Sequence, residues 1–227
     1  LEPQYLYPLV RGKDIKKWSY KCIYDIIIPY EANMKTVLTK DKLEKDSENL
    51  YKYFFDQSFN KYSADFIDIL VNRGTYKKHY SNVCVPEYVL YNIGEYTSAP
   101  YKVVWKALAS KGMEACVISE HKGKIIIPDH NNIMIPFENE KEAHYLCSIL
   151  NAKIVGRFID SYISWFKSNH ILENINIPKF DDSDRIHIAL CELSMEAHNN
   201  ALVNNGNKIS EIEEQIELLV IKLLMNE

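Results

Sequence analysis

The C-terminal end of the chain carries the pattern that most constrains its fold, a run of apolar residues at regular helical spacing. These residues follow one another at intervals of three, four, three and four: Ile209, Ile212, Ile216, Leu219 and Leu223. Such spacing places them on one stripe of a helix that packs lengthwise against another helix. Residues 185–203 have a second helical pattern, with Asp184 in position to cap its start. Because only the polar residues 204–207 separate the two segments, we expect an antiparallel helical hairpin.

The middle of the chain predicts strands followed by a helix. Two β-branched runs, Ile125–Ile127 and Ile133–Ile135, are each closed by a proline and are separated by the turn-forming residues 129–132. Short apolar runs bounded by turn residues are typical of buried strands. A helix is expected to begin near Glu140, because acidic residues favour a helix N-terminus. Its apolar positions fall on one face: Ala143, Leu146, Cys147 and Leu150.

The other expected elements alternate along the chain. Strands are predicted at residues 22–30, 88–93, 99–105, 117–118 and 175–178, and further helices at residues 41–57, 63–72 and 154–163. Residues 121–124 are expected to form a hairpin turn. The sequence therefore predicts an α+β fold, with a globular mixed α/β domain at residues 1–180 and a helical hairpin at residues 181–227.

No catalytic centre is expected in this chain. The sequence contains none of the glycine-rich nucleotide-binding motifs, no G-x-S-x-G and no H-E-x-x-H. His144 and Cys147 share a helical neighbourhood, but without a second pair of ligands we interpret them as packing residues rather than a zinc site. Asp129 and His130 could take part in acid–base chemistry, yet no third residue orients them. We therefore expect neither a metal nor a cofactor in this chain.

The charge distribution indicates an anionic partner. From Arg73 to Lys124 there are eight basic and four acidic residues, a net of 8 − 4 = +4, whereas Asp181 to Glu227 has three basic and ten acidic residues, a net of 3 − 10 = −7. A localised basic region beside an acidic tail is typical of a protein that binds a polyanion through one surface. A solvated basic face without a partner is the alternative.

Several basic segments include aromatic or amide side chains, which suits contacts to phosphates, stacked bases and base edges. The candidate DNA-contacting residues are Arg73, Lys77, Lys78, Tyr80, Lys102, Lys106, Lys111, Lys122, Lys124, Lys167 and Asn169. Their concentration in the predicted sheet and its loops favours double-stranded DNA as the partner.

The five cysteines show no C-x-x-C spacing, and each has apolar or aromatic neighbours in the sequence. This pattern is typical of free, buried thiols in a reducing compartment. The chain begins with no signal peptide and contains no apolar run of membrane-spanning length. We therefore expect a cytoplasmic protein, present here as a fragment of something larger, with no membrane partner.

Four segments, in order along the chain, carry a resemblance to a known family. They read YPLVRGKDIKKW (residues 7–18), APYKVVW (99–105), LNAKIVGRFI (150–159) and INIPKFDDSDRIHIALCELSMEAH (175–198). Together they resemble the C-terminal target-recognition region of bacterial adenine-specific DNA methyltransferases and of the fused type IIG restriction–modification enzymes. The arrangement is also similar to the specificity subunits of type I systems, in which a target-recognition domain is joined to a helical hairpin.

The resemblance implies a division of labour. Methyl transfer would belong to a separate N-terminal domain that binds S-adenosylmethionine, and this chain would read the DNA sequence and position the target adenine, by flipping it out of the helix. The alternative is an interaction module whose hairpin pairs with a separate methylase subunit. Five landmark positions are expected to be structural rather than DNA-contacting: Gly12, Pro100, Trp105, Asn151 and Pro178.

Overall fold

The computed structural model describes residues 1–109, 112–163 and 166–225 and has the predicted α+β fold. It divides into two compact units, each built from two segments of the chain. Unit 1 comprises Leu1–Tyr7 and Asp25–Ser98, and unit 2 comprises Pro8–Tyr24 and Ala99–Glu227. This division differs from the boundary predicted at residue 180, because the C-terminal hairpin shares its hydrophobic core with the central sheet and so belongs to unit 2.

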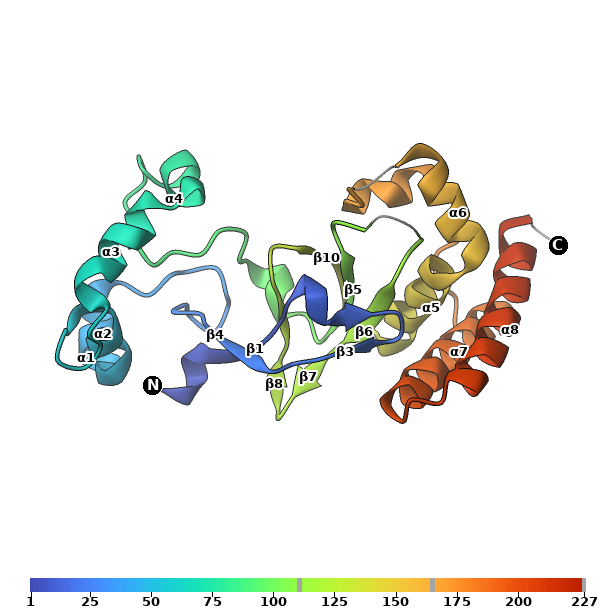
Figure 1. Ribbon diagram of the computed structural model, residues 1–227, viewed down its shortest axis with the longest axis horizontal. Helices are drawn as coiled ribbons and strands as arrows, with labels where there is room; N and C mark the ends of the chain where they lie inside the picture. The colour runs from blue at the N-terminus through green and yellow to red at the C-terminus, as the bar shows by residue number, and fades with distance from the viewer. Residues whose placement is uncertain (110–111, 164–165, 226–227) are drawn as a thin grey trace. The chain divides into compact units, whose positions relative to one another are not determined.

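Unit 1 is mostly helical, with α1 (Lys40–Asp46), α2 (Glu48–Phe55), α3 (Ser63–Asn72) and α4 (Gly74–His79), and short 3-10 turns η1 (Pro3–Tyr5) and η3 (Glu95–Ser98) (Figure 1). The helix predicted at residues 63–72 is confirmed with its exact bounds. The helix predicted at residues 41–57 is instead two helices, because the backbone leaves the helical region at Ser47. The side chain of Glu2 then accepts hydrogen bonds from the amides of Asn49 and Leu50, at 2.7 and 2.9 Å, and so caps α2.

The core of unit 1 explains why one predicted strand does not form. Leu43, Leu50 and Phe54 pack with Tyr88, whose ring stacks on Phe54 at 4.8 Å. The buried Tyr88 hydroxyl donates to the carbonyl of Leu38 at 2.8 Å. The segment around Tyr88 is therefore held by its side chain, and residues 88–93 form turns rather than the expected strand.

Unit 2 is organised around a three-stranded antiparallel sheet. Its central strand β5 (Tyr101–Lys106) pairs with β10 (Asn132–Phe137) on one side and with β6 (Ala115–Ile118) on the other. Trp105 lies opposite Ile133 and Ala115 in this register, and its ring is buried. The predicted strands at residues 99–105 and 117–118 form as β5 and β6, although β5 begins only at Tyr101.

Smaller sheets flank the central one. β9 (Ile127–Pro128) runs parallel to β1 (Leu6–Val10), which also neighbours β4 (Tyr24–Ile27). Two hairpins, β2–β3 (Ile15–Lys16 with Ser19–Tyr20) and β7–β8 (Glu120–His121 with Lys124–Ile125), complete the set. The turn predicted at residues 121–124 is confirmed, with Lys122 and Gly123 both at positive φ (53° and 74°), as a two-residue hairpin turn requires.

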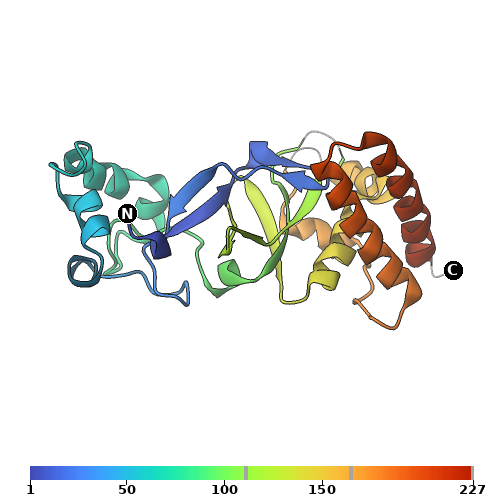
Figure 2. The same ribbon diagram turned by 90° about the horizontal axis from the view of Figure 1, so that it is seen from below.

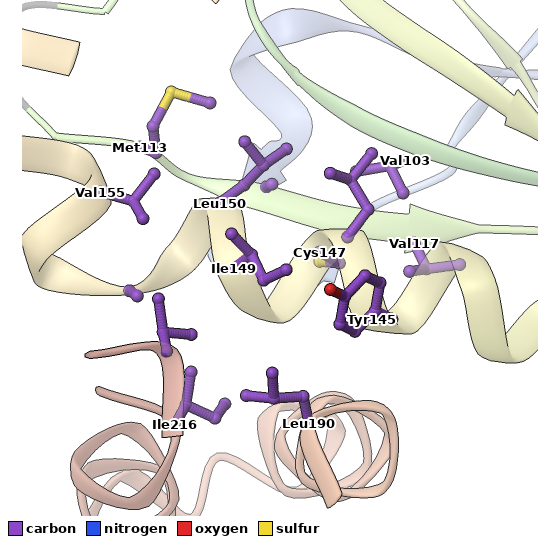
Figure 3. Packing of buried hydrophobic residues seen from close by; sticks show 14 of the residues in the cluster. Val103, Met113, Val117, Tyr145, Cys147, Ile149, Leu150, Val155, Leu190 and Ile216 are labelled. Atoms are coloured by element: carbon purple, nitrogen blue, oxygen red, sulfur yellow. The ribbon is translucent and has the colours of Figure 1, made fainter. Parts of the chain in front are cut away.

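Helices cover one face of the sheet of unit 2: α5 (Glu140–Asn151), α6 (Lys153–Tyr162), α7 (Arg185–Leu202) and α8 (Gly206–Met225), with 3-10 turns η2 (Gly12–Asp14) and η4 (Asn169–Asn174). Figure 2 shows α7 and α8 side by side as the predicted antiparallel hairpin. The helix α5 lies between the sheet and this hairpin, with Val103 and Val117 above it and Leu190 and Ile216 below it (Figure 3). On the apolar stripe of α8, Ile212, Ile216 and Leu223 are thus buried within unit 2, and Ile209 and Leu219 pack partly buried against the same core.

Three landmarks that the sequence marked as structural hold these layers together. The amide side chain of Asn151 both accepts from the backbone N–H of Ala115 (2.9 Å) and donates to its carbonyl (2.8 Å), which ties the end of α5 to β6. The indole of Trp105 donates to the carbonyl of Lys167 at 2.8 Å. The carbonyl of Pro178 accepts a hydrogen bond from the Tyr145 hydroxyl at 3.0 Å.

Residues 175–178 do not form the predicted strand. Instead, the backbone N–H of Asp181 donates to Nδ1 of His187, which fixes the proton of that ring on Nε2, facing the Tyr145 hydroxyl at 3.3 Å. Side-chain contacts to α5 and α7 therefore replace strand pairing in this segment. Among the cysteines, Cys116, Cys147 and Cys191 are buried as expected, whereas Cys84 is exposed.

Candidate nucleic-acid interface

The candidates from unit 1 cluster on α4 and the loop after it. Lys77 and Lys78 are exposed, and within the described ranges neither enters an ion pair. Beside them the ring of His79 stacks on Tyr91 at 4.6 Å, and Tyr91 is 50% exposed. Tyr80 is half-buried and donates its hydroxyl to the carbonyl of Leu90 at 3.3 Å. The structure thus places two uncommitted cations next to an accessible aromatic stack.

Arg73 has a structural role. Its guanidinium donates to the carbonyls of Leu70, Glu87 and Val89, at 2.8–2.9 Å, and so closes the loop that follows α4. Burial lowers the pKa of this guanidinium, but an arginine remains charged. A contact between Arg73 and DNA would therefore have to replace three hydrogen bonds that the side chain already makes.

Two candidates in unit 2 are buried, so the expectation that they contact DNA is wrong. Lys102 is 0% exposed, and its Nζ donates to the carbonyl of Ala99 at 2.6 Å. Lys167 is also 0% exposed, and its Nζ donates to the carbonyl of Gly112 and pairs with Asp160 at 2.7 Å. Both ammonium groups are hydrogen-bonded inside unit 2 and are inaccessible to a ligand.

The remaining candidates of unit 2 lie at or near the surface. Lys106 is half-buried and pairs with Glu114 at 2.8 Å. Lys122 is exposed at the tip of the β7–β8 hairpin, and Lys124 is half-buried beside it. Asn169 is exposed at the first residue of η4. Lys111 lies outside the residues that the structure describes.

A second basic surface of unit 2 was missed by the sequence reasoning. We call it the basic ribbon, and it consists of Arg11, Lys13, Lys16, Lys21 and Tyr24 on and around η2 and the β2–β3 hairpin. The guanidinium of Arg11 lies 3.7 Å from the centre of the Tyr24 ring, and the Lys13 ammonium lies 5.9 Å from it. Lys13, Lys16 and Lys21 are exposed, and Tyr24 is 40% exposed. Cations and an accessible aromatic ring thus share one surface.

A polar turn is fixed beside the basic ribbon. The Asp129 carboxylate accepts from the backbone N–H of Gly12 at 3.2 Å and from the side-chain amide of Asn132 at 2.9 Å. Gly12 allows this close approach, because a Cβ at this position would lie only 3.2 Å from the Cβ of Asn131. His130 and Asn131, at the tip of this turn, remain exposed. The contact between Asp129 and Gly12 thus places His130 and Asn131, which can form hydrogen bonds, beside the cations of the basic ribbon.

The charge of residues 11–24 was a signal available in the sequence. This segment holds five basic residues and one acidic residue, a net of 5 − 1 = +4, as large as that of the longer region around residues 73–124.

Neither a metal centre nor a membrane-crossing segment is found in the part of the chain that the structure describes. No three His, Cys, Asp or Glu side chains of these residues gather closely enough to hold an ion. None of the helices combines the length and the apolar composition needed to cross a bilayer.

No family model matches the chain, and a search of curated proteins finds no match to it.

Proposed function

We propose that the chain is the sequence-specific DNA-recognition module of a restriction–modification adenine DNA methyltransferase. Methyl transfer with S-adenosylmethionine would be carried out by a separate domain, or by a methylase subunit, and this chain would position the target adenine. The parent enzyme would be an adenine-specific methyltransferase or a type IIG restriction enzyme. The resemblance in the four ordered segments supports this assignment to a family.

The observation that carries the proposal is the basic ribbon with its polar turn. Exposed lysines supply the phosphate contacts that hold a protein on the duplex, and such contacts are largely independent of sequence. Asn131 and His130 supply side chains that form hydrogen bonds with base edges. Because Asp129 ties the turn to Gly12, the two kinds of contact are fixed at one place on unit 2.

Lys77 and Lys78 on α4 provide a further set of phosphate contacts in unit 1. The neighbouring stack of His79 on Tyr91 is an accessible π surface. Aromatic side chains of this kind bind unpaired bases by stacking. We therefore expect unit 1 to contribute its own contacts to DNA binding.

In the alternative arrangement, the chain pairs with a separate methylase subunit through its helical hairpin. Ile212, Ile216 and Leu223 are buried inside unit 2 and cannot serve such a contact. The outer side of α8 could serve it, because Leu218 is 63% exposed.

Fluorescence anisotropy with a labelled DNA duplex, at low salt, tests the proposal on the full chain. The variant Lys13→Glu/Lys16→Glu should weaken binding by at least about tenfold, because it replaces two phosphate-binding cations with anions. The matched control, Lys141→Glu/Lys222→Glu, changes the net charge equally at exposed lysines of α5 and α8 and should retain most of the affinity. Equal weakening by both variants, or no binding by the wild-type chain at low salt, would refute the basic ribbon as a DNA-binding surface.

A further inference from the structure

A cavity of about 350 Å³ in unit 2 belongs to neither of the basic surfaces. Six of the residues that line it decide its chemistry: Trp18, Tyr20, Tyr101, Glu140, His144 and His198. Its volume lies at the lower end of the range for small-molecule sites, about 300–1,000 Å³, so it can hold a whole small molecule.

Two uncharged imidazoles form one wall of the cavity. The ring of His198 donates from Nδ1 to the carbonyl of Ser194 at 2.7 Å and accepts at Nε2 from the backbone N–H of Val117 at 2.9 Å, so the neutral Nδ1–H form is fixed. His144 packs edge-on against it, with ring centres 4.8 Å apart. Burial lowers the pKa of His144 to about 3 and that of His198 to about 4, so neither ring carries a charge at neutral pH.

His144 leaves one polar atom for a ligand. The side chain is 6% exposed, and its Nδ1 pairs with the Ser194 hydroxyl at 2.9 Å. Its Nε2 has no hydrogen-bond partner among the residues that the structure describes. Because the Ser194 hydroxyl can rotate to match either tautomer, Nε2 can accept or donate a hydrogen bond. This nitrogen at the cavity wall can therefore form a hydrogen bond with a bound ligand.

The charge of the lining selects the ligand. Of the described residues that line the cavity, Glu140 is the only carboxylate, and none is a lysine or an arginine. An anion would therefore meet the like charge of Glu140 and no lysine or arginine, whereas a cation would meet a carboxylate.

The aromatic residues strengthen the same preference. Trp18 lies at the turn of the β2–β3 hairpin with φ of +65°, a conformation that is rare for a bulky residue. Its indole N–H donates to Glu213 at 2.8 Å, which anchors the ring at the cavity. Tyr20 and Tyr101 line the cavity as well, and burial raises the pKa of Tyr20, so its hydroxyl stays protonated. Aromatic rings beside a carboxylate are a common arrangement for binding organic cations.

We propose that this cavity binds a small organic ammonium ion, whose positive charge is recognised by Glu140 and by the rings of Trp18, Tyr20 and Tyr101. A hydrogen bond to Nε2 of His144 would orient a hydroxyl or N–H group of the ligand. The site does not depend on DNA binding, so it can be tested whether or not the proposed function is correct.

Isothermal titration calorimetry on the full chain can separate charge recognition from apolar filling. The probes are choline and its neutral isostere 3,3-dimethyl-1-butanol, in which carbon replaces the charged nitrogen. We expect saturable binding of choline and at least about tenfold weaker binding of the isostere, because only the cation gains from the rings and the carboxylate. Absence of saturable choline binding, or equal affinity for both probes, would overturn the proposal.

Two matched pairs of variants locate the site. Glu140→Gln should lower the affinity for choline by about tenfold, because it removes the counter-charge, whereas Glu138→Gln, at an exposed acid just before α5, should leave it unchanged. Tyr20→Leu removes a ring from the cavity and should weaken binding, whereas Tyr62→Leu removes an exposed ring outside it and should leave binding unchanged. Unchanged affinity in Glu140→Gln, with circular dichroism confirming the fold, would show that the cation binds elsewhere.

Discussion

The buried Lys102 makes the sharpest prediction about stability. Its side chain is 0% exposed on the central strand β5, and one carbonyl, that of Ala99, accepts from its ammonium group. Burial lowers its pKa from 10.5 to about 8. A difference of about 2.5 units, at 1.36 kcal/mol each, means that the charged form destabilises the folded state by about 3 kcal/mol at neutral pH.

Replacing Lys102 with Met removes this cost and keeps a side chain of similar length. The variant loses the hydrogen bond to Ala99 and leaves that buried carbonyl without its partner, at a cost of about 1–2 kcal/mol. We therefore expect Lys102→Met to raise the free energy of unfolding by about 1–2 kcal/mol at pH 7.

The pH dependence has a definite sign. Below pH 8 the lysine is protonated in both states and the full penalty applies. Between pH 8 and 10.5 the folded protein releases the proton while the unfolded chain retains it, so wild-type stability rises relative to the variant. The advantage of Lys102→Met should thus shrink as the pH rises from 7 to 9.5.

Urea denaturation followed by tryptophan fluorescence measures this effect, because all three tryptophans fall in the sequence ranges of unit 2. The variant and the wild type are compared at several pH values, so that other titrating groups cancel in the difference. A variant that is less stable than the wild type at pH 7, or a difference that does not change up to pH 9.5, would refute a buried, charge-penalised Lys102.

Three further substitutions test the contacts that order unit 2, each by urea denaturation. Asn151→Leu removes both hydrogen bonds to Ala115 and should lower the free energy of unfolding by about 1–3 kcal/mol, because the buried N–H of Ala115 loses its partner while its carbonyl keeps the N–H of Trp18; a loss below about 0.5 kcal/mol would contradict this. Asp184→Ala removes the side chain that caps α7 and should lower the free energy of unfolding by about 1 kcal/mol. Asp184→Asn keeps a capping oxygen and should retain most of the stability. Tyr145→Phe removes the hydroxyl bonded to Pro178 and should lower the free energy of unfolding by about 1–2 kcal/mol. An unchanged denaturation midpoint would show that this bond does not hold residues 175–178 in place.

Local patterns predicted the helices well, because amphipathic spacing and capping act within a few residues. The side chain of Asp184 accepts from the backbone amides of residues 186 and 187, as its place before the helix suggested. The apolar face of α5 is buried as its spacing predicted, since Ala143, Cys147 and Leu150 are all 0% exposed.

The failures come from contacts between distant segments. Residues 88–93 and 175–178 have apolar residues typical of strands, but side-chain hydrogen bonds from Tyr88 and Tyr145 hold them as irregular chain. Lys102 appeared to be a surface cation, although it sits next to the apolar run Val103–Trp105 in a strand that is buried at four consecutive positions. Strands buried on both faces lack the alternation that marks an outward side chain.

The candidate interface was predicted only in part for the same reason. Lys77, Lys78 and Lys122 are exposed as expected, because they lie in turns and at a helix end. The basic ribbon depends on residues 11–24 meeting residues 129–132 through Gly12 and Asp129, which are 117 positions apart. No local pattern could indicate that contact.

Selection from a pool of duplexes with a randomised central segment tests the central claim most directly. The full chain is mixed with the pool at moderate salt, and bound DNA is recovered and sequenced over several rounds. Recognition of DNA sequence predicts the enrichment of one short motif by the wild type and by Lys141→Glu/Lys222→Glu, and its loss in Lys13→Glu/Lys16→Glu. Recovered DNA with the same sequence composition as the starting pool would contradict the account.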